Sequence, residues 1–86
     1  MKYYLYILRS DVDNNLYVGI SADPNKRLLE HNLGFSKSTK CRRPFKLIYT
    51  EEFASKQEAA KMEWHLKNTP SGGILKKQLA KDNTGL

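Results

Sequence analysis

The sequence contains few residues that cross-link a chain or break its helices and strands. Its 86 residues include one cysteine, three prolines and five glycines. The single cysteine, Cys41, excludes an internal disulfide, and the two histidines, far apart in the chain, provide no cysteine and histidine set for zinc. The absence of disulfides fits a reducing compartment, so we expect a cytoplasmic protein in which Cys41 has no special role.

Long hydrophobic runs are also absent. No apolar stretch approaches the roughly 20 residues of a membrane-spanning helix, and the apolar stretch near the N-terminus is short and ends at Arg9, unlike a signal peptide. Hydrophobic residues nevertheless make up 40% of the chain, which is typical of a globular protein. We therefore expect no membrane association and one compact domain over residues 1–81, followed by a flexible tail, 82–86.

Acidic residues are scarce relative to basic ones. Nine Asp and Glu stand against 15 Lys and Arg, which gives a formal net charge of +6 at pH 7. Such an excess favours polyanionic partners, namely DNA, RNA or an anionic membrane surface. Residues 34–44 contain no acid at all. We interpret this segment as a basic loop that contacts nucleic-acid phosphates through Lys37, Lys40, Arg42 and Arg43.

Three segments have the composition of strands. Residues 3–8 are rich in Tyr, Leu and Ile on both alternating faces, so this strand should be central and covered on both sides. Residues 16–20 follow a polar turn, 11–15, and predict a hairpin with the first strand. A third strand is predicted over residues 45–53. Together they indicate an α/β (α+β) fold with a small three-stranded antiparallel sheet flanked by helices.

Three helices are expected around this sheet. Asp23 and Pro24 form a typical helix start, and the helix should run to about Leu33, with an apolar stripe of Leu28, Leu29 and Leu33. Ser55 and Glu58 form a capping box that opens a second helix, ending near Asn68. Residues 69–73 should interrupt the helical structure after this second helix. A last helix, about 74–81, should turn Ile74, Leu75 and Leu79 inward.

Glu63 is an unusual residue for its position on the second helix. Ala59, Met62 and Leu66 form an apolar stripe at helical spacing, and Glu63 falls within it. A carboxylate on a buried face costs several kcal/mol unless it is paired or bound to a metal. Glu63 should therefore have a partner, either a metal ion or a Lys or Arg side chain. The alternative is a stripe edge wet enough to need none.

Two further pairs could carry chemistry. Arg27 and His31 lie four residues apart on the first helix and share a face, where a guanidinium suits phosphate and an imidazole moves protons. Tyr6 and Tyr17 lie on paired strands and could be close in space. A neighbouring cation would make a phenolate more accessible. The alternatives are a solvated helix face for the first pair and core packing for the second.

The order of these motifs resembles that of a GIY-YIG nuclease domain. The family's two strand motifs correspond here to Tyr4-Leu5-Tyr6 and Tyr17-Val18-Gly19, followed by a helix with Arg27 and His31 and a later helix with Glu63. The likeness covers the chain up to about Lys67. It departs from the family where Tyr4 replaces a glycine, which adds bulk near the expected phosphate, and where Val18 replaces isoleucine.

The resemblance implies roles for these residues. Tyr6 would be the general base or orient the attacking water, Tyr17 would support it, and His31 would assist proton transfer. Arg27 would steady the scissile phosphate, and Glu63 would bind one Mg²⁺ (or Mn²⁺). The implied activity is metal-dependent cleavage of DNA, selective for structure or dependent on a protein partner, in repair or recombination. Two alternatives remain, a non-catalytic nucleic-acid-binding module and a protein that binds structured RNA.

Overall fold

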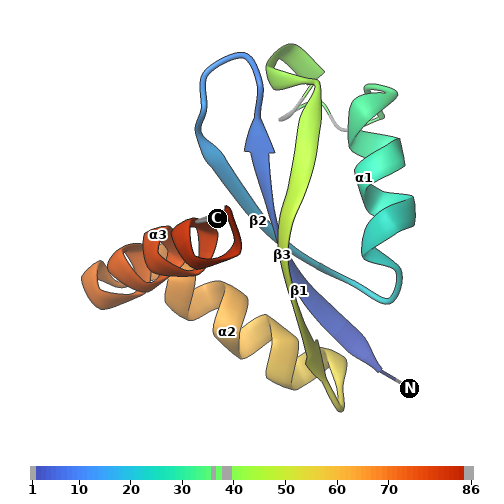
Figure 1. Cartoon of the computed structure of the whole chain (residues 1–86). Helices are drawn as coiled ribbons and strands as arrows, with labels where there is room; N and C mark the ends of the chain where they lie inside the picture. The colour runs from blue at the N-terminus through green and yellow to red at the C-terminus, as the bar shows by residue number, and fades with distance from the viewer. Residues whose placement is uncertain (1, 36, 38–39, 85–86) are drawn as a thin grey trace.

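The computed structural model describes residues 2–35, 37 and 40–84, with side chains up to residue 80. Its centre is a three-stranded antiparallel sheet of order β2-β1-β3 (Figure 1). The strands are β1 (Tyr3–Ser10), β2 (Leu16–Ser21) and β3 (Phe45–Phe53). The strand with two apolar faces, β1, is central as predicted, and its residues 5–8 are buried. The bounds of β3 match those expected from the sequence.

Helices cover both faces of the sheet. On one side lies α1 (Pro24–Asn32), and on the other lie α2 (Lys56–Asn68) and α3 (Pro70–Thr84) (Figure 1). The first face is filled by a cluster around Tyr6, Leu8 and Phe45, and the second by a cluster around Leu5 and Ile7. A 3₁₀ turn, η1 (Lys40–Arg42), precedes β3. The predicted class of fold is confirmed.

The predicted starts of two helices are confirmed by their caps. The Asp23 carboxylate accepts a hydrogen bond from the backbone N–H of Lys26 at 3.2 Å, and Pro24 occupies the first turn of α1. The Ser55 hydroxyl accepts one from the N–H of Glu58, also at 3.2 Å. Each cap satisfies an amide that has no partner inside its own helix, which is why these residues fix where the helices begin.

The break predicted over residues 69–73 is confirmed at its start, but it is confined to Thr69. α2 ends at Asn68, and α3 begins at Pro70. The Thr69 hydroxyl accepts a hydrogen bond from the N–H of Gly72 at 2.9 Å and so acts as a helix cap. A Cβ atom on buried Gly72 would overlap the backbone carbonyl of His65. The glycine therefore permits a close crossing of α2 and α3, and the predicted last helix begins four residues too late.

The early start changes which side chains α3 turns inward. Leu75 and Leu79 pack against the cluster beneath α2, as predicted, whereas Ile74 is exposed and the expectation for it is wrong. α3 continues to Thr84, three residues into the segment predicted as a tail. Gly85 and Leu86 lie outside the described residues. Within the described part of the chain, no helix combines the length and the hydropathy needed to cross a membrane.

The predicted apolar stripe of α1 is also wrong in two of its three members. Leu29 is 59% exposed and Leu33 is 55% exposed, and only Leu28 packs against the sheet. The inward face instead carries His31, which is fully buried, and Asn32. The Asn32 side chain accepts a hydrogen bond from the N–H of Phe45 at 2.6 Å and donates one to its carbonyl at 3.1 Å. These two hydrogen bonds fasten α1 to β3.

We predict that Asn32→Ala lowers the free energy of unfolding by about 2 to 4 kcal/mol, because both backbone groups of buried Phe45 lose a partner. Urea unfolding followed by circular dichroism should show a lower midpoint with an unchanged slope. Asn25→Ala, at an exposed position of the same helix, is the matched control and should have little effect. Equal stability of the two variants would contradict the fastening role of Asn32.

Candidate active site

Tyr6 is placed by the register of the hairpin. In the antiparallel pair of β1 and β2, Tyr6 lies directly opposite Gly19. A Cβ atom on Gly19 would overlap the ring and hydroxyl of Tyr6, so the ring occupies the space that any other residue would fill. From there the Tyr6 hydroxyl lies 3.3 Å from Nε2 of His31 on α1. The close approach at glycine thus directs a strand tyrosine toward the helix that covers it.

His31 lies within an aromatic cluster. Its ring centre is 4.9 Å from that of Tyr17 in an edge-on contact, 6.2 Å from that of Tyr6 and 6.0 Å from that of Phe45. Burial lowers the pKa of His31 below its ordinary value of 6.5, and the charge of Arg27 lowers it further. His31 is therefore neutral at pH 7, and one of its ring nitrogens can accept a proton.

Tyr6 itself keeps its proton at neutral pH. Burial is the largest influence and raises its pKa above the ordinary 10. Hydrogen bonding by Arg27 lowers this pKa, while the neighbouring Tyr17 and the charge of Glu63 raise it. The sequence suggested that a nearby cation would make the phenolate more accessible. The cation is present, but the loss of hydration outweighs it.

Arg27 reaches the same cluster from α1 but already has a carboxylate partner. Its Nη1 lies 2.9 Å from Oε1 of Glu30, one turn along the helix. This pairing and the Tyr6 hydroxyl both raise the pKa of Arg27, with Glu30 the larger cause. The Arg27 side chain is 39% exposed, so part of its guanidinium fork still faces solvent. A phosphate arriving there would compete with Glu30 for it.

Glu63 approaches from the opposite side of the sheet, near the β2 edge. Its carboxylate lies 3.2 Å from Nζ of Lys67, and the two side chains are 26% and 42% exposed. The same Nζ lies 5.4 Å from the centre of the Tyr17 ring. Because the charge of Glu63 acts on Tyr6, this carboxylate belongs to the neighbourhood of both tyrosines. Lys67 is thus a side-chain cation of the kind expected as a partner for Glu63.

The donor set at Glu63 suits a weakly chelated divalent ion. Among the described residues, no group of three or more His, Cys, Asp and Glu side chains could enclose a metal. A half-buried single carboxylate matches Mg²⁺, which keeps several waters and also binds phosphate oxygens of a substrate. Lys67 is partly exposed and flexible, so it could turn away from Glu63 when a cation arrives.

The structure divides the predicted basic loop between two surroundings. Lys37 and Lys40 are exposed. Arg42 turns toward the hairpin and pairs with Asp13 at 3.1 Å, whereas Arg43 lies against Gly34 at the end of α1. Ser36, Ser38 and Thr39 lie outside the described residues. Arg42 and Arg43 of this loop therefore face different parts of the molecule.

Two residues of the site were not singled out from the sequence. Gly19 is needed by the contact with Tyr6, and the register of the predicted hairpin could have indicated it. Lys67 pairs with Glu63 across one helical turn, a spacing at which opposite charges commonly meet. The five predicted residues, Tyr6, Tyr17, Arg27, His31 and Glu63, come from β1, β2, α1 and α2, and the structure brings them into one neighbourhood.

Comparison with known proteins gives one consistent result. Residues 2–72 match the family described as the GIY-YIG catalytic domain. A UPF0213 protein of Staphylococcus saprophyticus is 45% identical over 67 residues, which are 77% of this chain and 80% of that protein. One from Bacillus pumilus is 44% identical over 67 residues, 77% of this chain and 67% of that protein. The solution NMR structure of the UPF0213 protein BH0048 from Bacillus halodurans has a TM-score of 0.56 and 31% identity, covering 98% of this chain and 94% of that one.

The lowered pKa of His31 predicts acid sensitivity. In the unfolded chain the His31 imidazole takes up a proton near pH 6.5, and in the folded chain it does so only at lower pH. The free energy of unfolding is therefore highest above pH 6.5 and decreases as the pH falls below that value. One such group gives a slope of at most about 1.4 kcal/mol per pH unit. Urea unfolding at about pH 7.5 and about pH 5.5, above the carboxyl range, measures it.

His31→Gln should remove most of this slope, while His65→Gln, which removes the other histidine, should leave it in place. A slope that persists in His31→Gln and disappears in His65→Gln would show that the buried imidazole is not the cause.

Proposed function

Since the chain belongs to the GIY-YIG catalytic domain family, a nuclease family that acts on DNA, we propose that it is a divalent-metal-dependent DNA endonuclease. The observation that carries the proposal is the contact of the buried Tyr6 hydroxyl with neutral His31, with Arg27 and the pair of Glu63 and Lys67 around it. A proton acceptor, phosphate-binding cations and a carboxylate are the groups that phosphodiester hydrolysis needs.

Proton transfer in this proposal begins at Tyr6. The attacking water passes a proton to the Tyr6 oxygen while the Tyr6 hydroxyl passes its own to Nε2 of His31, which lies 3.3 Å away. The water oxygen bonds to phosphorus, the opposite phosphorus–oxygen bond breaks, and the leaving oxygen takes a proton from solvent. The raised pKa of Tyr6 excludes a standing phenolate at neutral pH, so Tyr6 acts as a relay and His31 as the base.

Charge on the phosphate is met by cations that already reach solvent. Arg27 and Lys67 are 39% and 42% exposed, whereas the Tyr6 hydroxyl behind them is buried. A phosphate would meet the two cations first, exchange with the carboxylates that hold them, and then lie against Tyr6. The planar fork of Arg27 suits two phosphate oxygens, which stabilises the charge that builds as the bond breaks.

Glu63 would hold the divalent ion, Mg²⁺ or Mn²⁺. Once bound, such an ion polarises the phosphate and neutralises the leaving oxygen. Binding of the ion at Glu63 would release Lys67 from its ion pair. The freed ammonium would then be available to the phosphate of the substrate.

We propose selectivity for branched, flapped or damaged DNA, or dependence on a protein partner, in repair or recombination. Arg42 of the basic loop is paired with Asp13, and Arg43 lies against Gly34, so these two cations do not form one surface for reading a long sequence of bases.

We predict that Glu63→Gln reduces cleavage of plasmid or branched DNA in Mg²⁺ by about 100-fold or more while leaving DNA affinity within about twofold, because the amide keeps the shape but not the charge. Glu58→Gln, an exposed carboxylate on the same helix, is the matched control and should cut normally. Cleavage is followed on gels and affinity by fluorescence anisotropy in EDTA.

Two outcomes would replace this function. DNA binding without cleavage of any substrate, by the wild type in Mg²⁺ or Mn²⁺, would make the protein a non-catalytic nucleic-acid-binding module. Structured RNA that displaces DNA at the same salt concentration would favour an RNA partner, since both contacts depend on salt through their phosphates.

The relay predicts a pH profile for cleavage. His31 must be neutral to accept a proton, so kcat/KM should rise with pH and level off, with an apparent pKa below the ordinary 6.5. His31→Gln should lower the rate by about 100-fold or more and abolish this rise. A profile that is unchanged in His31→Gln would assign the proton transfer to another group.

A further inference from the structure

A hollow of about 790 Å³ lies at the end of the sheet where the hairpin turns, between that turn and α3. Its walls include Arg9 of β1, Leu16 of β2 and Lys76 of α3. Arg9 pairs with Leu16, and the preceding pair is Leu8 with Tyr17. Successive strand residues point to opposite faces, so Arg9 and Tyr17 lie on opposite sides of one hairpin. The hollow is therefore on the opposite face of the hairpin from Tyr17.

The lining of this hollow is strongly basic. It contains four cations, Arg9, Arg42, Lys76 and Lys77, and one acid, Asp13. Asp13 is paired with Arg42 at 3.1 Å. Within the part of the chain that the structure describes, Arg9, Lys76 and Lys77 have no ion pair. Three uncompensated positive charges therefore face one cavity, an arrangement that attracts a polyanion.

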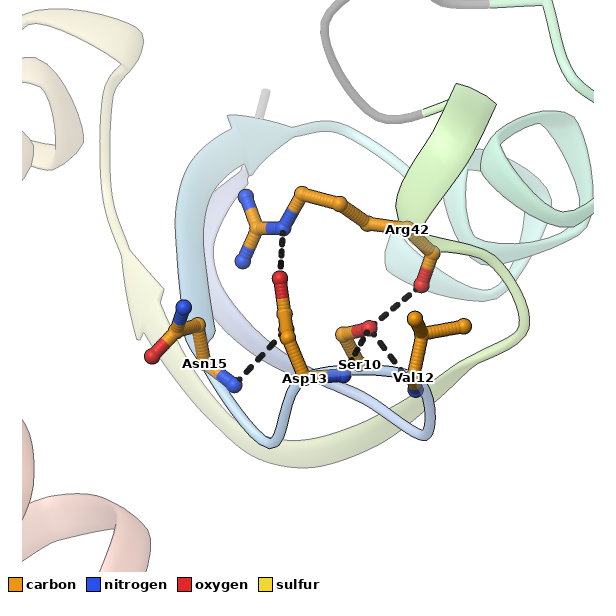
Figure 2. A network of polar contacts seen from close by, with 5 residues as sticks. All are labelled: Ser10, Val12, Asp13, Asn15 and Arg42. Carbon is orange, nitrogen blue, oxygen red and sulfur yellow. Dashed lines mark hydrogen bonds and ion pairs between the residues drawn. The ribbon is translucent and has the colours of Figure 1, made fainter.

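The turn holds Arg42 in this wall through a fixed polar network (Figure 2). The buried Ser10 hydroxyl donates a hydrogen bond to the Arg42 carbonyl and accepts one from the N–H of Val12 at 3.1 Å. The Asp13 carboxylate accepts from the N–H of Asn15 at 2.9 Å, and this bond is the largest cause that lowers the Asp13 pKa. One wall of the hollow is thus an ordered turn.

We propose that this hollow binds the phosphate backbone of a second DNA segment while the first lies at Tyr6. The inference rests on the proposed function and specifies its substrate. The molecule measures 29 × 28 × 26 Å along its principal axes, and duplex DNA is stiff over that length. A straight duplex that lies against Tyr6 on the α1 side does not also reach the hollow on the opposite face of the hairpin. A junction or flap has a second arm that can, so occupation of both sites selects branched DNA.

The test is binding in EDTA, where no cleavage occurs. The probes are a synthetic three-way junction and a linear duplex with the same number of base pairs. The variant Arg9→Gln/Lys76→Gln/Lys77→Gln should bind the junction more weakly than the wild type, by a factor of about ten or more. The slope of the logarithm of its binding constant against the logarithm of the salt concentration should be smaller in magnitude by about 2 to 3. Its affinity for the linear duplex should stay within about twofold. Lys76→Gln/Lys77→Gln, which leaves β1 intact, repeats the test should the triple variant fold poorly.

The control removes the same charge elsewhere, through Lys2→Gln/Lys56→Gln/Lys61→Gln. It should weaken the binding of both probes to the same small degree and so keep the wild-type preference for the junction. Equal weakening of junction and duplex by the hollow variant, a control with the same effect as the hollow variant, or a wild type that does not prefer the junction would each overturn the proposal. If the protein prefers the junction but cleaves no substrate, the nuclease function is contradicted and the second binding site is still supported.

Discussion

The contact between Tyr6 and Gly19 is the constraint on which the site depends. The ring fills the space above the glycine backbone, which fixes the register of β1 against β2 and turns a hydroxyl inward. That hydroxyl would be costly to bury alone, and His31 supplies the partner. Burial of the imidazole then requires a polar inward face on α1. One cross-strand pair thus sets the strand register, the chemistry of the covering helix and the proton affinities of both groups.

This constraint explains where sequence reasoning failed on α1. Hydropathy placed Leu28, Leu29 and Leu33 inward, as it would for a helix whose only task is to cover a sheet. The inward face instead follows His31 and Asn32, because one contacts Tyr6 and the other is bonded to Phe45. The energy of satisfied polar groups decided the rotation of the helix, and local hydropathy carries no information about partners that lie on distant strands.

Features with local causes were predictable, and those with tertiary causes were not. The caps at Asp23 and Ser55, the hairpin turn and β3 follow from neighbouring residues, and the structure contains them at the expected positions. Gly72 looks like a helix breaker in the sequence, yet it is inside α3 because His65 of another helix lies against it. For Glu63, helical spacing predicted a paired carboxylate, but the choice between Lys67 and a metal ion depends on what approaches the exposed side of the pair.

The tyrosines of the site also belong to one of the two hydrophobic clusters of the core. Tyr6 and Tyr17 are packed with Leu8, Phe45 and Leu28 on the α1 side of the sheet, and a chain this short has little other apolar volume on that face. Catalytic and structural effects of substitution therefore overlap at the tyrosines, whereas the charged groups at the rim, Arg27 and Lys67, can be changed with smaller losses of packing. The basic hollow lies on the other face of the hairpin, so its cations can be changed without altering the cluster around Tyr6.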